Sequence, residues 1–196
     1  MTPFFNPGPH DYPDIPIYIA GVNPRLCQLA GELGQGFLVY PFHSARYLRE
    51  QILPNIELGL ARSGRQRSDI QLSSTIFVIP TDDEQEAARY EADARQQLAF
   101  YVSTPSYRRV MALHGWGDTA DDLGALAVRR RSSEMPRLIT AEMLGIFVVR
   151  GAWAELPYKL QQKYGDSLDR LSYYLPYRPG HNDSGWRATI AGFRDS

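Results

Sequence analysis

The sequence predicts an α/β fold built on a parallel β-sheet. Short apolar, β-prone segments alternate with segments whose apolar residues recur at helical spacing, and this unit occurs four times. The third predicted strand is apolar on both faces near its end, which is typical of a parallel sheet covered on both sides. Four such units are half of a (β/α)8 barrel, and the 196 residues are fewer than the ~250 of a whole barrel. An open doubly wound sheet is the alternative arrangement.

The first strand–helix unit has clear boundary residues. The apolar run at residues 17–20 predicts a strand that ends at Gly21. Asn23 is a favourable N-cap and Pro24 suits the first helical position, so a helix is expected to begin there.

The second unit follows the same pattern. Residues 37–40 predict a short strand that ends at Pro41, and Ser44 can cap the next helix. Pro54 is expected to kink that helix and Gly64 to end it.

The third strand is predicted at residues 70–79. Asp82 is expected to cap the following helix, with Gln85 at the capping-box position, and the helix is expected to run to about residue 102.

The remaining chain is predicted to be mainly helical. A helical stretch is expected from residue 105 to 164, interrupted at residues 114–117 and near Gly151. Residues 170–175 form the fourth predicted strand, and residues 184–193 a terminal helix.

Composition limits the classes of function. The formal net charge is −1, which argues against binding to nucleic acid as the main function. No apolar run is long enough for a membrane span, and the single Cys27, expected in the core, excludes an internal disulfide. No spacing of histidine and carboxylate residues suggests a metal site. We therefore expect a cytoplasmic protein with a proline-rich lead-in at residues 1–15 and one domain at residues 16–196.

Two loops that follow predicted strands are candidate sites. The loop at residues 20–24 opens a helix, so its backbone N–H groups could bind an anion, although such a loop is more often a plain strand-to-helix turn. It carries neither the Rossmann nor the Walker pattern. Tyr40 and His43 follow the second strand, where a barrel would have its catalytic mouth, and His43 is either a substrate contact or an ordinary polar residue. The aromatic residues within 100–107 suggest either the wall of a pocket for a planar ligand or a helix corner.

A series of short segments, spread over nearly the whole chain from Pro16 onward, occurs in an order and spacing that together are specific enough to indicate a protein family. They are residues 16–24, 29–32, 36–37, 41–44, 46–50, 99–101, 103–107, 114–117, 139–144 and 169–172. This series resembles the luciferase-like monooxygenase family, and within it the coenzyme F420-dependent branch.

The resemblance implies a (β/α)8 TIM-barrel fold of which this chain holds the second half, strands five to eight with a helical insert. In the family, the first half carries the usual acid–base residues. The resemblance therefore implies an oxidoreductase or monooxygenase but transfers no catalytic residue, and whether this chain is itself an enzyme stays open.

The resemblance also implies binding residues. The family's loop after strand five contacts the cofactor, which here corresponds to Gly21, Val22 and Asn23, although relatives often have two glycines in place of Val22 and Asn23. The loop after strand six contacts substrate, which here corresponds to Tyr40 and His43. The implied cofactor is coenzyme F420, with FMN as the alternative.

The leading hypothesis is a deazaflavin-dependent oxidoreductase that moves a hydride between the coenzyme and a small organic substrate. The alternative is a non-catalytic half-barrel that folds by pairing with itself or with a separately encoded first half. Half a barrel has two open strand edges and an uncovered interior, which favours such pairing.

Overall fold

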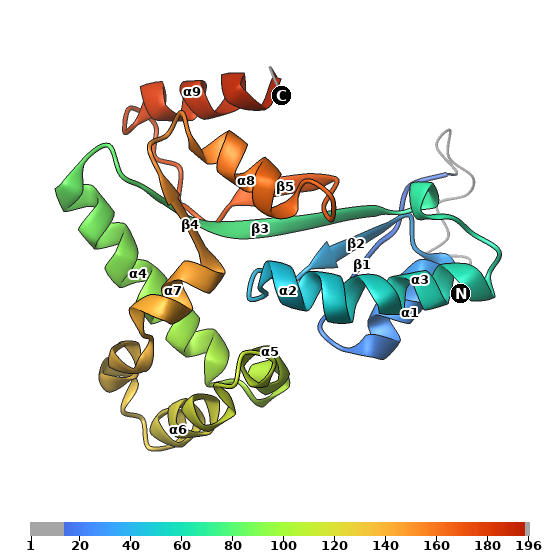
Figure 1. The fold of residues 1–196 in the computed structure, drawn as a ribbon, viewed down its shortest axis with the longest axis horizontal. Coiled ribbons are helices and arrows are strands. Elements are labelled where there is room, and N and C mark those ends of the chain that lie inside the picture. The colour runs from blue at the N-terminus through green and yellow to red at the C-terminus, as the bar shows by residue number, and fades with distance from the viewer. Residues whose placement is uncertain (1–13, 195–196) are drawn as a thin grey trace, which may run out of the picture.

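A computed structural model describes residues 14–194, which include most of the predicted domain and only residues 14–15 of the predicted lead-in. The strands are β1 (Tyr18–Gly21), β2 (Gly36–Val39), β3 (Gln71–Pro80), β4 (Val148–Gly151) and β5 (Arg170–Tyr173). The helices are α1 (Pro24–Leu33), α2 (Ala45–Tyr47), α3 (Leu53–Arg62), α4 (Glu84–Val102), α5 (Arg108–Ala112), α6 (Gly117–Val128), α7 (Ala141–Phe147), α8 (Leu156–Tyr164) and α9 (Asp183–Arg194). Strands alternate with helices, and the α/β prediction is confirmed (Figure 1).

All strand pairs in the sheet are parallel, with β3 at its centre. Along its first half β3 pairs with β2 and with β5, and along its second half it pairs with β4. The order β1-β2-β3-β4 follows the chain without a reversal, and β5 also pairs with β3. A doubly wound sheet would reverse direction at a switch point, so the structure favours half of a barrel over that alternative.

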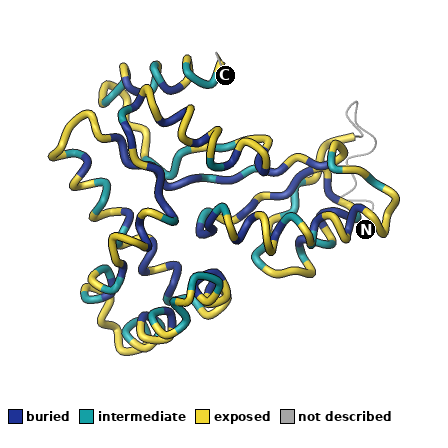
Figure 2. The backbone as a smooth tube through the Cα atoms, viewed as in Figure 1, coloured by how far each residue is buried: buried dark blue, intermediate teal, exposed yellow. Residues whose placement is uncertain are grey.

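One face of the sheet, here called the outer face, packs against helices. Phe37 and Leu72 are neighbours across β2 and β3, and both are fully buried. The helices α1 and α3 beyond them approach so closely that a Cβ added to Gly59 would lie 2.0 Å from the carbonyl oxygen of Gln28. Figure 2 shows the buried backbone following the strands while the far sides of the helices are exposed. The hydrophobic core therefore lies between the outer face and the helices.

The opposite face, here called the inner face, is largely uncovered along β1, β2, β5 and the first half of β3, between Tyr18 at one edge and Thr75 on β3. Ala20, Leu38, Ser73 and Arg170 lie side by side across four strands. The Leu38 side chain is 44% exposed although it occupies the middle of a parallel sheet. In a closed barrel this face would line the interior.

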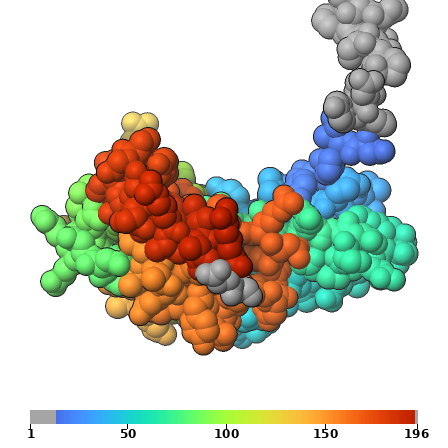
Figure 3. Space-filling model, turned by 90° about the horizontal axis from the view of Figure 1, so that it is seen from above, coloured from blue at the N-terminus to red at the C-terminus, as the bar shows by residue number. Residues whose placement is uncertain are grey.

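Two helical parts flank the sheet. The helices α4 to α7 form a lobe that extends from the carboxyl end of β3, with Leu98, Met111 and Leu123 fully buried inside it (Figure 1). The terminal helix α9 packs against α8, and in Figure 3 its red atoms lie next to the orange atoms of the segment that contains α8.

Most of the predicted boundaries in the first half are confirmed. Asn23 caps α1, accepting a hydrogen bond from the Leu26 N–H at 3.0 Å, and Ser44 caps α2. The expected break near Pro54 takes the form of a π-helical turn at Leu48–Ile52 between α2 and α3.

Two predictions about local structure are wrong. Asp83, not Asp82, caps α4, because its side chain accepts from the Glu86 N–H, whereas Asp82 accepts from the Trp153 N–H instead. The stretch predicted as helical to residue 164 also contains β4, which was not expected. It begins directly after α7 without a glycine or proline between them, so the apolar run showed no break there.

Candidate functional site

The loop after β1 is shaped by its contact with the first turn of α1. A Cβ added to Gly21 would lie 2.6 Å from the Leu26 Cβ, so this position has no room for a side chain. The Asn23 side chain is occupied by its capping bond to the Leu26 N–H. The loop can therefore offer a ligand backbone groups and the exposed surface of Val22 more readily than the Asn23 amide.

Four of the five predicted binding residues line one hollow at the carboxyl ends of β1 and β2. Gly21 and Val22 form one side, Tyr40 and His43 another, and Tyr107 closes it from the helical lobe. This strand-end hollow has about 260 Å³ of space, including the part open to solvent. Asn23 lies next to it without lining it. The fold thus brings together two loops that are about 20 residues apart in the sequence.

His43 lies at the base of the strand-end hollow and is only 3% exposed. Its Nε2 is 2.8 Å from Ser74 Oγ, and Ser74 donates its own proton to the Val39 carbonyl. The Ser74 hydroxyl has a single proton, so the His43 ring donates from Nε2. Burial lowers the pKa of His43 to about 4, and the nearby Lys163 charge acts in the same direction. At neutral pH His43 is an uncharged side chain that fixes the loop to β3, and its predicted contact with substrate stays a prediction.

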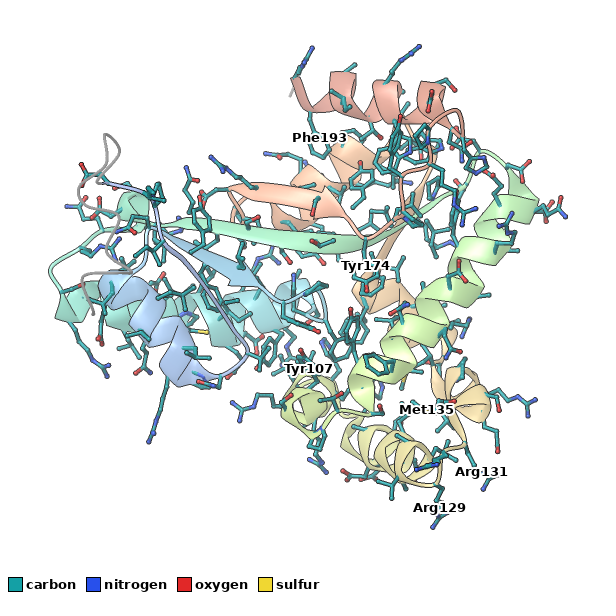
Figure 4. The ribbon with its side chains drawn as sticks, turned by 180° about the vertical axis from the view of Figure 1, so that it is seen from behind. Tyr107, Arg129, Arg131, Met135, Tyr174 and Phe193 are labelled. Atoms are coloured by element: carbon teal, nitrogen blue, oxygen red, sulfur yellow. The ribbon has the colours of Figure 1, made fainter. Side chains whose placement is uncertain are left out.

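Tyr40 is part of an aromatic cluster that extends across the strand ends. Its ring stacks on Tyr107 with centroids 4.9 Å apart and meets Tyr101 edge-on at 5.5 Å. The Tyr101 hydroxyl lies 2.7 Å from that of Tyr174, whose ring stacks on Phe77. Tyr107 and Tyr174 mark the two ends of this cluster in the space between the sheet and α4 (Figure 4).

Hydroxyl groups of the cluster lie close to one another. The Tyr101 and Tyr174 hydroxyls are 2.7 Å apart, and the Tyr40 ring contacts the rings of both Tyr101 and Tyr107. Burial, followed by the neighbouring tyrosine hydroxyls, raises the pKa of both Tyr101 and Tyr107. These phenols are therefore protonated at neutral pH and present neutral O–H groups along the strand ends.

Only part of this cluster is predicted from the sequence. The aromatic residues around Tyr101 and Tyr107 are predicted as either a pocket wall or a helix corner, and not as binding residues. Tyr174 was missed because its partner Tyr101 is 73 residues away in the chain. The one available signal is the position of Tyr174 near the carboxyl end of the strand predicted at residues 170–175, which is the end where barrels place ligand contacts.

Two further findings concern the part of the chain that the structure describes. Within residues 14–194, no group of three or more His, Cys, Asp or Glu side chains is arranged to hold a metal ion. Among the same residues, no helix is both long and apolar enough to cross a membrane. Cys27 is buried as expected, and burial raises the pKa of its thiol to about 11.

The parallel strands form half of a barrel, and the loops after β1 and β2 meet at their carboxyl ends. These features place the chain in the class of α/β barrel proteins. The model of the luciferase-like monooxygenase family matches residues 1–170, and the chain belongs to this family. A protein of Mycobacterium tuberculosis that is described as uncharacterized is 39% identical over 171 residues, which cover 87% of this chain and 50% of that protein.

Two further relatives carry functional names. The 5,10-methylenetetrahydromethanopterin reductase of Archaeoglobus fulgidus is 30% identical over 152 residues, which cover 75% of this chain and 42% of the reductase. The structure of a coenzyme F420-dependent tetrahydromethanopterin reductase from Methanopyrus kandleri superposes with a TM-score of 0.68 at 20% identity, covering 91% of this chain and 49% of that one. The chain thus spans about half the length of the relatives it matches, and the half-barrel interpretation of its fold is confirmed.

Proposed function

We propose that this chain is the second half of a coenzyme F420-dependent oxidoreductase, which transfers a hydride between the deazaflavin and an organic substrate. The observation that carries the proposal is the strand-end hollow, in which the loops after β1 and β2 meet at the edge where parallel α/β barrels bind ligands. The Archaeoglobus reductase, a relative by sequence, supports the reaction class. The single cysteine, a free thiol, is consistent with a cytoplasmic location, which is part of the proposal.

The residues present fit one edge of such a coenzyme. Gly21, Val22 and Asn23 would support its phosphate side through the backbone at the start of α1. Tyr40 and His43 would lie on the substrate side, Tyr40 directly and His43 by fixing the loop. The enclosed volume of the hollow is only about 10 Å³, far below the ~300 Å³ at which small-molecule sites begin, so most of the contacts would come from the other half of the barrel. The bound coenzyme supplies the hydride chemistry, and the protein supplies position and electrostatics.

The proposal is tested with a complete barrel. A chimera that joins the first half of the Mycobacterium tuberculosis relative to residues 16–196 is titrated with coenzyme F420, and coenzyme fluorescence is followed. We expect saturable binding that Gly21→Val weakens by about tenfold or more, because a side chain there displaces the loop. Gly145→Ala, in an open position on α7, is the matched control.

FMN is titrated in parallel because it is the alternative cofactor. Preferential binding of FMN by the folded chimera would replace the deazaflavin assignment. A folded chimera that binds neither coenzyme would exclude the proposed function.

A second candidate function is a non-catalytic half-barrel that pairs with another chain. The exposed Leu38 and the neighbouring small residues of the inner face favour it, because parallel sheets are normally covered on both faces. Light scattering after size-exclusion chromatography tests it. A stable dimer, or a complex with a co-expressed first half, would support pairing, whereas a well-folded monomer that binds no first half would count against it.

A further inference from the structure

We propose that a second hollow, between α4 and the segment that follows β5, binds a flat ring bearing N–H donors, with Asp93 and Gln97 as its specificity-determining residues. This α4 hollow is lined by β3, by α4 and by residues 174–176. Its cavity volume is about 320 Å³, which is at the lower end of the ~300–1,000 Å³ range of small-molecule sites. None of its lining residues belongs to the strand-end hollow.

The apolar part of the α4 hollow is suited to a flat ring. Phe77 and Val78 contribute from β3, and Leu175 from the segment after β5. The Tyr174 ring stacks on Phe77 with centroids 4.3 Å apart and planes 27° apart. Such a stacked pair presents an extended flat surface, and aromatic rings pack well in offset or edge-on contact with it.

The polar part of the α4 hollow offers hydrogen-bond acceptors along one side of α4. Tyr90, Asp93 and Gln97 project from successive turns of this helix and line the hollow together. Asp93 is exposed and has no hydrogen bond or ion pair among the described residues, and it also lines a smaller neighbouring hollow together with Arg89 and Arg178. The Gln97 Oε1 accepts a long bond of 3.5 Å from Tyr174. The unpaired carboxylate and the weakly used amide oxygen favour a ligand that donates N–H groups to them.

The aromatic cluster connects the α4 hollow with the strand-end hollow. Tyr174 lines the former and Tyr40 lines the latter. Tyr101 contacts both, through its hydroxyl to that of Tyr174 and edge-on to the Tyr40 ring. A ring held in the α4 hollow would therefore lie beside the group that we assign to the substrate side. The assignment of this ring to the substrate rests on the proposed oxidoreductase function. Binding itself is independent of any coenzyme.

The test uses the full 196-residue chain and three quinolines of similar shape. 2-Aminoquinoline carries N–H donors, 2-methylquinoline carries none, and quinoline-2-carboxylate is an anion. Affinities are measured by calorimetry and the site is located by saturation-transfer NMR. We expect 2-aminoquinoline to bind at least about fivefold more tightly than the other two, which corresponds to one charge-assisted hydrogen bond.

Variants locate the binding to the α4 hollow. Asp93→Asn should weaken binding of 2-aminoquinoline about tenfold. Asp122→Asn, which changes an exposed carboxylate on α6 that does not line the hollow, should leave binding unchanged. Tyr174→Leu should weaken all three quinolines, whereas Tyr174→Phe, which keeps the ring, should restore binding to within about twofold.

Three results would overturn the inference: no binding of 2-aminoquinoline, tighter binding of the carboxylate, or an affinity that neither Asp93→Asn nor Tyr174→Leu changes. Thermal unfolding of each variant separates a loss of fold from a loss of site. The coenzyme titration of the chimera is independent of these outcomes, so failure here leaves the proposed coenzyme function standing and the reverse also holds.

Discussion

The two faces of the sheet share the same strands but have opposite environments. On the outer face, Phe37 and Leu72 are fully buried under helices, while on the inner face Leu38, the next residue along β2, is 44% exposed. Alternation along a strand sends neighbouring residues to opposite faces, so the difference comes from what covers each face and not from the strands themselves. The outer face is a completed core, and the inner face is largely uncovered.

The largest expected effect compares one leucine from each face. Leu72→Ala should lower the free energy of unfolding by about 2–5 kcal/mol, because it leaves a cavity in a closed core. Leu38→Ala should lower it by less than about 1 kcal/mol, because that side chain is already partly in water. Urea unfolding followed by circular dichroism measures both. Equal losses would mean that the inner face is packed in solution.

The next effect is the pH dependence of the free energy of unfolding. It comes from His43, which is buried and fixes the loop after β2 to Ser74 on β3. The pKa of His43 is lowered from 6.5 to about 4 by burial. The unfolded chain therefore binds the proton first as the pH falls, so the stability from the neutral histidine is complete above pH 6.5 and is lost between pH 6.5 and 4. A shift of this size corresponds to at most about 3 kcal/mol.

The measurement is the unfolding free energy from pH 7.5 to 4.5 for the native chain and for His43→Gln. The variant should be less stable at pH 7.5 but should show a flatter pH profile. Parallel profiles would show that His43 is not the buried neutral group described here. His114, whose pKa is also lowered by partial burial, is common to both proteins and cancels in the comparison.

A smaller effect tests how tightly the helices of the outer face pack. Gly59→Ala should destabilise the chain by about 1–3 kcal/mol, because its Cβ would collide with the Gln28 carbonyl of α1. Gly145→Ala on α7 has no atom within 4 Å of the new Cβ and should be neutral or slightly stabilising. The melting temperatures of the two variants should therefore change in opposite directions, or the change should be clearly larger for Gly59→Ala. Similar shifts would contradict the close approach of α1 and α3.

Much of this fold could be predicted from local sequence. The caps Asn23 and Ser44 act through contacts three residues away, and their helices begin where the sequence indicates. β4 could not be predicted, because its four residues continue an apolar run from α7 and become a strand only by pairing with the second half of β3. Tertiary pairing decided that segment.

The candidate site could likewise be predicted only where it depends on local sequence. Its loops could be located because each follows a strand, and the fold brings Gly21, Val22, Tyr40 and His43 together. The burial of His43 could not be inferred, because it depends on Ser74, which lies 31 residues further along the chain. Position along a strand predicts which loops meet, whereas the role of each side chain depends on long-range packing.

The smallest expected effect on stability comes from a substitution on the inner face. Ser172 is exposed on β5, and its hydroxyl lies 2.8 Å from that of Thr75. Ser172→Arg removes one exposed hydrogen bond and places a long charged side chain on the inner face, so it should cost less than about 1 kcal/mol in the chain alone.

The same Ser172→Arg variant should fail to form any dimer or half-barrel complex that uses the inner face, because the arginine would be buried without a partner. Light scattering measures assembly and urea unfolding measures stability on the same samples. Arg170→Lys, which keeps the charge on the same strand, is the matched control. A variant that loses more than about 2 kcal/mol would show that this face is already part of a core, whereas one that assembles normally would move the interface elsewhere.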